Sequence, residues 1–141
     1  MAMKEKAQAW LCILNRENFE IVKEKRVYGI PKNTRAINSM KTFKRGDVLL
    51  FYAISPTKRI LGISEVASSM YEESKPSLWR DRSYPYRVRI SHVNEIAVPL
   101  KDFIGKIGSV KNRIPMGMSI IPISEKDLET IRKLVHDHAK D

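Results

Sequence analysis

Residues 45–66 read RGDVLLFYAISPTKRILGISEV, and this stretch decides the fold. Val48 to Ile54 is an unbroken apolar run between two turn signals, which is typical of a central strand. Gly46 supplies backbone freedom in the first turn, and SPTK forms the second. The following segment, RILGISEV, carries Gly62 where a barrel strand bends or admits a close neighbour. The two runs together predict a β-hairpin.

Further strands and helices are predicted on both sides of this hairpin. Strands are predicted in AWLCIL (9–14), YPYRVRI (84–90) and MSIIPIS (118–124). Helices are predicted in NRENFEIVKEKRV (15–27), with Asn15 or Asn18 as its cap, in NTRAINSMKTF (33–43), and in EKDLETIRKLVHDHAK (125–140) behind a Ser124–Asp127 capping box. The expected fold is a single α+β domain over residues 1–141, a small mixed β-barrel with flanking helices.

Charge is the strongest compositional signal, because the chain carries a formal net charge of +10. The segment 124–141 is close to balanced, so the surplus lies in the part of the chain before it. A polyanionic partner is the first interpretation, and a well-solvated surface is the alternative. A single cysteine, Cys12, in an apolar run predicts a buried thiol in a reducing compartment. With no signal peptide and no membrane span expected, a cytoplasmic location is predicted.

Sequence motifs for catalysis are missing. The chain has no glycine-rich phosphate loop, no HExxH and no CxxC pair. His136 and His138 are two residues apart near the end of a helix, so they do not share a helical face. We therefore expect no catalytic residues, no cofactor and no metal, and a binding module in place of an enzyme.

The stretch from Leu78 to Ile90, LWRDRSYPYRVRI, combines three aromatic rings with four arginines. Strand alternation predicts that Tyr84, Tyr86 and Val88 point one way while Arg87 and Arg89 point the other. Trp79 stands in a polar loop, where a large ring has no periodic core role. Its two interpretations are a ligand contact and a plug at one barrel end.

The ordered set of motifs resembles the EVE domain, a member of the PUA-like superfamily that also contains the YTH and ASCH domains. The motifs that carry the resemblance are the early strand with Trp10, RENFEIVKEKRVYGIPK (16–32), RGDVLLFYAI (45–54), RILGISEV (59–66) and YPYRVRI (84–90). Phe19 and Tyr28 stand where relatives usually have tryptophan. The resemblance implies a PUA-like barrel that binds a modified nucleobase, flipped from its strand, between aromatic walls.

A base-binding pocket needs aromatic faces for stacking and a few polar groups that read the base edge. The predicted pocket residues are Asn15, Asn18, Tyr28, Gly29, Ser55, Tyr71, Trp79 and Tyr84. Phosphates beside the base require cations near the pocket mouth. The predicted phosphate-binding residues are Lys32, Arg35, Arg80, Arg82 and Arg87.

Two other functions compete with nucleic-acid binding. The same pocket would serve a binder of free nucleosides or other small molecules. An ASCH-like amidohydrolase would need a lysine and a glutamate facing each other, and Lys58 with Glu65 are the candidates. RNA and DNA are equally compatible with the sequence, as are all oligomeric states.

Overall fold

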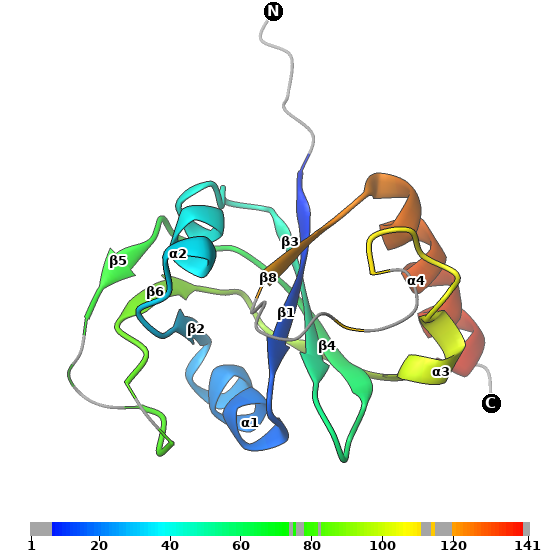
Figure 1. Cartoon of the computed structure of the whole chain (residues 1–141), viewed down its shortest axis with the longest axis horizontal. Helices are drawn as coiled ribbons and strands as arrows, with labels where there is room; N and C mark the ends of the chain where they lie inside the picture. Colours follow the sequence, from blue (N-terminus) through cyan, green and yellow to red (C-terminus); the bar gives the residue numbers. More distant parts are fainter. Residues whose placement is uncertain are drawn as a thin grey trace, which may run out of the picture.

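The computed structural model describes residues 7–73, 75, 78–81, 83–110, 114 and 120–139. Its elements are β1 (Ala9–Leu14), α1 (Arg16–Lys25), β2 (Val27–Ile30), α2 (Thr34–Lys41), β3 (Val48–Ala53), β4 (Arg59–Glu65), β5 (Tyr71–Glu72), β6 (Tyr86–Arg89), β7 (Asn94–Pro99), α3 (Leu100–Phe103), β8 (Ile120–Ile123) and α4 (Glu125–Ala139). They form a five-stranded sheet, β7-β4-β3-β1-β8, and a three-stranded sheet, β2-β6-β5 (Figure 1). The predicted α+β class is confirmed. None of the helices described is long and apolar enough to cross a membrane.

The predicted hairpin forms the middle of the larger sheet. β3 pairs antiparallel with β4 on one side and parallel with β1 on the other. Every residue of β3 is buried, because the sheet is covered on both faces. This explains why its sequence is continuously apolar and does not alternate.

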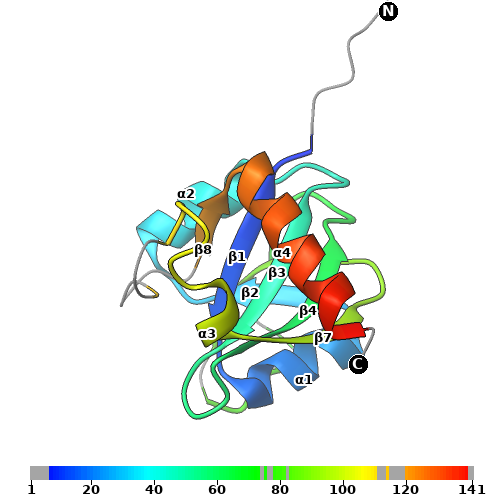
Figure 2. The ribbon, with the colours of Figure 1, turned by 90° about the vertical axis from the view of Figure 1, so that its right-hand side faces the viewer.

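The larger sheet divides the core into two halves. One half includes Trp10, Phe19, Phe51 and Val88, and lies between this sheet, the smaller sheet, α1 and α2. The other half includes Leu50, Phe103 and Ile131 and lies under α3 and α4. Figure 2 shows α4 crossing this second face of the sheet.

Gly62 is a point of close approach, as its position in the strand predicts. A Cβ atom there would lie 2.5 Å from Val93 Cγ1 and 2.9 Å from Phe19 Cε1. The pairing of β4 with β7 shifts register between Ile60 and Gly62. The bulge and the missing side chain let α1 pack directly on the sheet.

The cap of α1 settles the choice between its two asparagines. Asn15 Oδ1 accepts a hydrogen bond from the backbone N–H of Asn18 at 2.7 Å, so Asn15 is the N-cap. Asn33 caps α2 in the same way. At the other end of α1, Arg26 adopts a left-handed conformation with φ 55°, which turns the chain into β2. The side chain of Asn18 is thereby left for another role.

Half of the predicted capping box of α4 is confirmed, because the backbone N–H of Ser124 donates to Ser109 Oγ at 3.4 Å and not to the Asp127 side chain. The backbone N–H of Asp127 donates to Ser124 Oγ at 3.1 Å. The buried Asp127 carboxylate accepts from the backbone N–H groups of Gly108 and Ser109 at 3.2 and 2.8 Å. Burial alone would raise the pKa of Asp127, but the donors from Ser109, Gly108 and Ser124 outweigh it and lower the pKa below its ordinary value.

Asp127→Asn is expected to lower the free energy of unfolding at neutral pH by about 1–2 kcal/mol, because an amide accepts these hydrogen bonds more weakly than a carboxylate. A group with a lowered pKa contributes its stability above its ordinary pKa and loses it as the pH falls through the lowered value. The difference between the two proteins should therefore shrink below about pH 4. Urea unfolding at several pH values measures this difference in the free energy of unfolding. Glu129→Gln, which changes an exposed carboxylate on the same helix, is the control. A difference that persists unchanged at pH 2 would contradict the assignment.

Candidate functional site

A cavity of about 180 Å³ lies where α1, β2, the end of β3 and the loop before β6 meet. Its lining consists of Ile13, Leu14, Asn15, Asn18, Val22, Tyr28, Gly29, Ile30, Pro31, Ile54, Trp79, Asp81 and Tyr84. Six of the eight predicted pocket residues are therefore brought together from three separate segments. The other two, Ser55 and Tyr71, are not part of the lining.

Trp79 forms the aromatic wall of the cavity and is only 4 % exposed. Its ring lies edge-on to Tyr84, with centroids 5.1 Å apart and an interplanar angle of 62°. Its outer edge rests on the backbone at Gly29, where a Cβ would be 2.6 Å from Trp79 Cη2. The ring is thus packed inside the protein and also lines the cavity, so its packing does not exclude the predicted ligand contact.

Tyr28 forms the floor of the cavity. It is 2 % exposed, and its ring packs edge-on to Phe51 at 5.6 Å between centroids. Burial is the main cause that raises the pKa of Tyr28, and the neighbouring Cys12 thiol raises it further. Burial likewise raises the pKa of Cys12, far above the range in which a thiolate forms. The interior below the cavity is thus apolar and the thiol is unreactive.

Asn18, Asp81 and Tyr84 form the polar wall. Asn18 Nδ2 donates to Asp81 Oδ2 at 3.2 Å and to Tyr84 Oη at 2.9 Å. The Tyr84 hydroxyl donates to the same Asp81 oxygen at 2.6 Å. Asn18 is 6 % exposed and Asp81 is an exposed residue, so this polar wall runs from the interior to the surface and the two hydrogen bonds fix the orientation of the amide.

Arg87 was expected on the basic rim, and that placement is wrong. Its side chain is 3 % exposed. The guanidinium lies over the ring of Trp79, with Cζ 5.2 Å from the centroid, and Nε donates to the carbonyl of Tyr84 at 3.0 Å. The predicted alternation fails for Tyr84, which precedes β6 and contacts the same Trp79 ring as Arg87. The loop carrying Trp79 covers Arg87. A face predicted to meet water is therefore covered by the chain itself.

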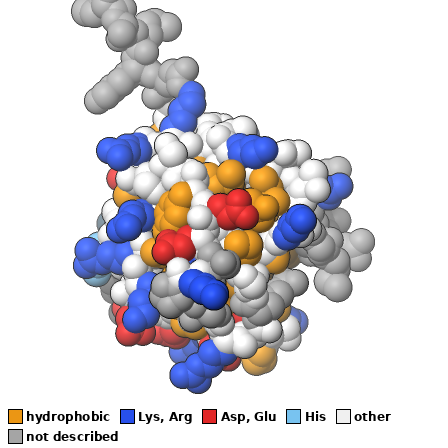
Figure 3. Space-filling model, turned by 90° about the vertical axis from the view of Figure 1, so that its left-hand side faces the viewer, with side chains coloured by type: hydrophobic (Ala, Val, Ile, Leu, Met, Phe, Trp, Pro, Cys, Tyr) orange, Lys and Arg blue, Asp and Glu red, His pale blue; other side chains and the backbone are white. Residues whose placement is uncertain are grey.

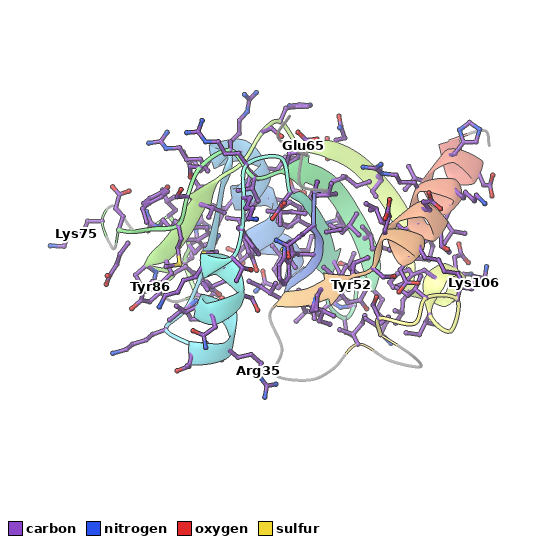
Figure 4. The ribbon with its side chains drawn as sticks, turned by 90° about the horizontal axis from the view of Figure 1, so that it is seen from above. Arg35, Tyr52, Glu65, Lys75, Tyr86 and Lys106 are labelled. Atoms are coloured by element: carbon purple, nitrogen blue, oxygen red, sulfur yellow. The ribbon has the colours of Figure 1, made fainter. Side chains whose placement is uncertain are left out.

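The other predicted phosphate contacts lie at the surface where they are described. Lys32, Arg35 and Arg80 are exposed, and Arg82 falls outside the described residues. Lys32 directly follows the lining residue Pro31, and Arg80 stands between two lining residues. Arg35 and Lys75 extend away from the body of the protein (Figure 4). On the face seen in Figure 3, lysine and arginine side chains are spread around a central group of hydrophobic ones.

The positions of Ser55 and Tyr71 in the fold explain why these two predicted pocket residues do not line the cavity. Ser55 follows Ile54 in an exposed turn, so Ile54 reaches the cavity instead. Tyr71 lies in β5, where it pairs with Arg87. The smaller sheet places β5 on the far side of β6 from β2, and the cavity is on the β2 side.

Sequence reasoning missed seven of the lining residues, and two of them, Asp81 and Ile54, matter most for what the cavity can bind. Asp81 had been counted only as a charge among arginines, yet it accepts from both Asn18 and Tyr84. Its position two residues after Trp79, in the same loop, could have identified it as a residue of the site. Ile54 was assigned to the buried strand, but β3 ends one residue earlier and Ile54 is 43 % exposed. It is an exposed apolar side chain at the cavity.

The suggested lysine–glutamate pair of a hydrolase is wrong. Lys58 precedes the first residue of β4 and Glu65 is the last, and both are exposed. An extended strand of that length separates them by roughly 20 Å. Neither belongs to the cavity lining. Within the described ranges, no group of three or more His, Cys, Asp or Glu residues could hold a metal ion.

The fold and its cavity define a class of small PUA-like α+β domains, and comparison with solved structures agrees. Human THYN1, solved in complex with DNA containing 5-methylcytosine, has a TM-score of 0.69 at 16% identity, covering 91% of this chain and 97% of that one. The Mmi1 YTH domain also has a TM-score of 0.69 at 16% identity, covering 96% and 92%. These similarities establish the fold.

The family follows from the sequence comparisons. The EVE domain family model matches residues 8–134. A UPF0310 protein of Pyrococcus abyssi is 36% identical over 141 residues, covering 89% of this chain and 98% of that protein. The chain belongs to the EVE domain family.

Proposed function

We propose that this protein is a nucleic-acid-binding module, not an enzyme, that takes a single modified base, flipped from its strand, into the cavity. The observation that carries the proposal is one small cavity whose lining combines the ring of Trp79 with the polar groups of Asn18 and Asp81. Stacking on the ring and hydrogen bonds to the base edge are the two interactions that hold flipped bases.

The size of the cavity favours one base over a larger ligand. Its volume of about 180 Å³ is below the roughly 300–1,000 Å³ of pockets that hold drug-sized molecules. Apolar side chains from Leu14, Val22 and Ile54 contribute to its lining. They offer a surface against which a base methyl group can be buried, a contact worth about 0.8 kcal/mol.

The charge distribution favours a base that is part of a polymer. Lys32 and Arg80 are exposed and adjacent in sequence to lining residues, so they flank the cavity. Cations in this position suit the phosphates on either side of a flipped base. The solved complex of the human relative with methylated DNA is consistent with this assignment.

Fluorescence anisotropy with labelled oligonucleotides tests the proposal. Strands with a methylated base should bind about fourfold more tightly than unmethylated ones if one methyl group is buried. On single strands, the logarithm of the affinity should fall with the logarithm of the salt concentration, with a slope near −0.7 per neutralised phosphate. Lys32→Ala, which removes an exposed cation next to the lining residue Pro31, should weaken binding several-fold and make this slope shallower by about 0.7.

Lys106→Ala is the matched control, because Lys106 lies beside α3, which packs on the other face of the large sheet from the cavity (Figure 4). It should leave the slope unchanged. Failure of single and double strands alike to bind at low salt would refute the proposal. Binding of free nucleosides with little salt dependence would instead support the small-molecule alternative, which uses the same cavity.

A further inference from the structure

We infer that the tip of the β3–β4 hairpin is a wedge for double-stranded nucleic acid, with the Ile54 side chain entering the base stack where the flipped base has left it. This inference rests on the proposed function and adds the form of the substrate, a duplex. It follows from the exposure of Ile54 beside the cavity and from the two cations, Lys58 and Arg59, at the same tip.

Ile54 is an exposed apolar side chain at the opening of the cavity. Among the described residues it is the one large hydrophobic residue that is exposed, at 43 %. It also belongs to the lining of the cavity. A single exposed apolar residue is ordinary on a protein surface, but a residue that is both exposed and part of the lining stands where a base must pass to enter.

The backbone around Ile54 is held in place, as a wedge requires. The N–H of Ile54 donates to the carbonyl of Leu14, at the end of β1, at 2.9 Å. The carbonyl of Ile54 accepts from the N–H groups of Thr57 at 3.1 Å and Lys58 at 3.4 Å. The carbonyl of Lys58 accepts from the N–H of Leu100, at the start of α3, at 2.9 Å. A turn tied to two other elements loses little conformational freedom when it binds.

Two cations accompany Ile54 at the tip of the hairpin, which projects from the lower edge of the molecule in Figures 1 and 2. Lys58 and Arg59 are exposed, and within the described ranges neither takes part in an ion pair. Arg59 pairs with Ala53 across the hairpin, so it lies on the same face of the sheet as Phe51. The cavity lies on this face as well. Both cations are therefore placed to contact phosphates next to a base that enters the cavity.

An apolar side chain with cations beside it suits a protein that opens a base stack. Proteins that unstack a duplex insert apolar wedges, isoleucine among them, between base steps. Taking a base out of a duplex costs free energy, and burial of the Ile54 side chain in the gap offsets part of this cost. A base in a single strand needs less of this support, because no partner strand has to be opened. The wedge therefore predicts that Ile54 matters more for duplexes than for single strands.

Fluorescence anisotropy with Ile54→Ala tests the wedge. The probes are DNA duplexes with one central 5-methylcytosine or N6-methyladenine, and the single strands that carry the same bases. The wild type should bind both forms. Ile54→Ala should weaken duplex binding about tenfold, because the gap is no longer filled, and single-strand binding less than about threefold. Ile54→Leu keeps an apolar wedge and should stay within about threefold of the wild type on both forms.

Ile104→Ala is the matched control. Ile104 packs in the half of the core that lies on the other face of the large sheet, next to α3. The same truncation there should leave the affinities for duplex and single strand unchanged. A comparable loss of duplex affinity in this control would mean that truncating any isoleucine has this effect, and would overturn the wedge.

The outcomes separate the inference from the function it rests on. Absence of binding to duplexes and single strands alike refutes the proposed function itself. Binding of single strands without binding of duplexes by the wild type overturns the wedge and leaves the function standing. Equal losses on both forms in Ile54→Ala, or no loss on either, also overturn it, because Ile54 would then support the cavity alone or contact nothing.

Discussion

Replacing Arg87 with alanine is expected to lower the free energy of unfolding by about 2–4 kcal/mol. A hydrogen bond from a charged donor to a buried carbonyl is worth about 1.5–3 kcal/mol, and Arg87 Nε donates to the carbonyl of Tyr84. Its cation–π contact with Trp79 adds about 0.5–2 kcal/mol. The ion pair with Glu73, at 4.0 Å and with Glu73 half exposed, adds little. Urea unfolding followed by circular dichroism measures the loss.

Arg89→Ala is the matched control for this change. Arg89 is two residues further along β6 and is exposed, and its hydrogen bond to Ser68 uses only the backbone N–H. Its replacement should change stability by less than about 0.5 kcal/mol. Equal losses in the two variants would mean that the guanidinium of Arg87 does not support the wall of the cavity.

The comparison of these two arginines shows where sequence reasoning reaches its limit. The predicted strand 84–90 is shorter in the structure, where β6 covers Tyr86–Arg89, with Arg87 buried and Arg89 exposed. Whether Arg87 meets water depends on the loop carrying Trp79, and no periodic signal in the loop predicts its path. The prediction of the central strand β3 did not depend on the path of any loop. Its apolar run needs cover on both faces, and that requirement alone placed β3 in the middle of the sheet.

Residues of the site could be predicted where their immediate sequence neighbours are unusual for that residue type. Trp79 stood out as a large ring in a polar loop, and Tyr28 as a ring before a glycine. Asp81 did not stand out, because its role depends on Asn18, 63 residues away in the chain. Contacts between residues so far apart in the sequence depend on the fold of the whole chain. The pairing of strands brings the end of β1, β2 and the loop before β6 together.

Gly29→Ala is expected to reduce the affinity for a base-bearing strand by up to about a hundredfold. The new Cβ would lie 2.6 Å from Trp79 Cη2 and 3.0 Å from both Trp79 Cζ3 and Tyr84 Cβ. The indole is rigid and Arg87 covers one of its faces, so the ring must leave its position. Stacking on the displaced ring, worth about 1–3 kcal/mol, would be lost. Overpacking should also lower the free energy of unfolding by about 1–3 kcal/mol.

The choice of control decides what this experiment can distinguish. Gly46 has open space around it but a φ of 91°, so alanine there is strained for a reason unrelated to the cavity. Gly108 has no positive φ, and its nearest atom to a new Cβ is 4.0 Å away. Gly108→Ala should therefore change neither binding nor, by more than about 0.5 kcal/mol, stability. Anisotropy and urea unfolding of both variants give the answer. If Gly29→Ala folds and binds a methylated strand as tightly as the wild type, Trp79 does not contact the base, and the proposed cavity is not where the base is held.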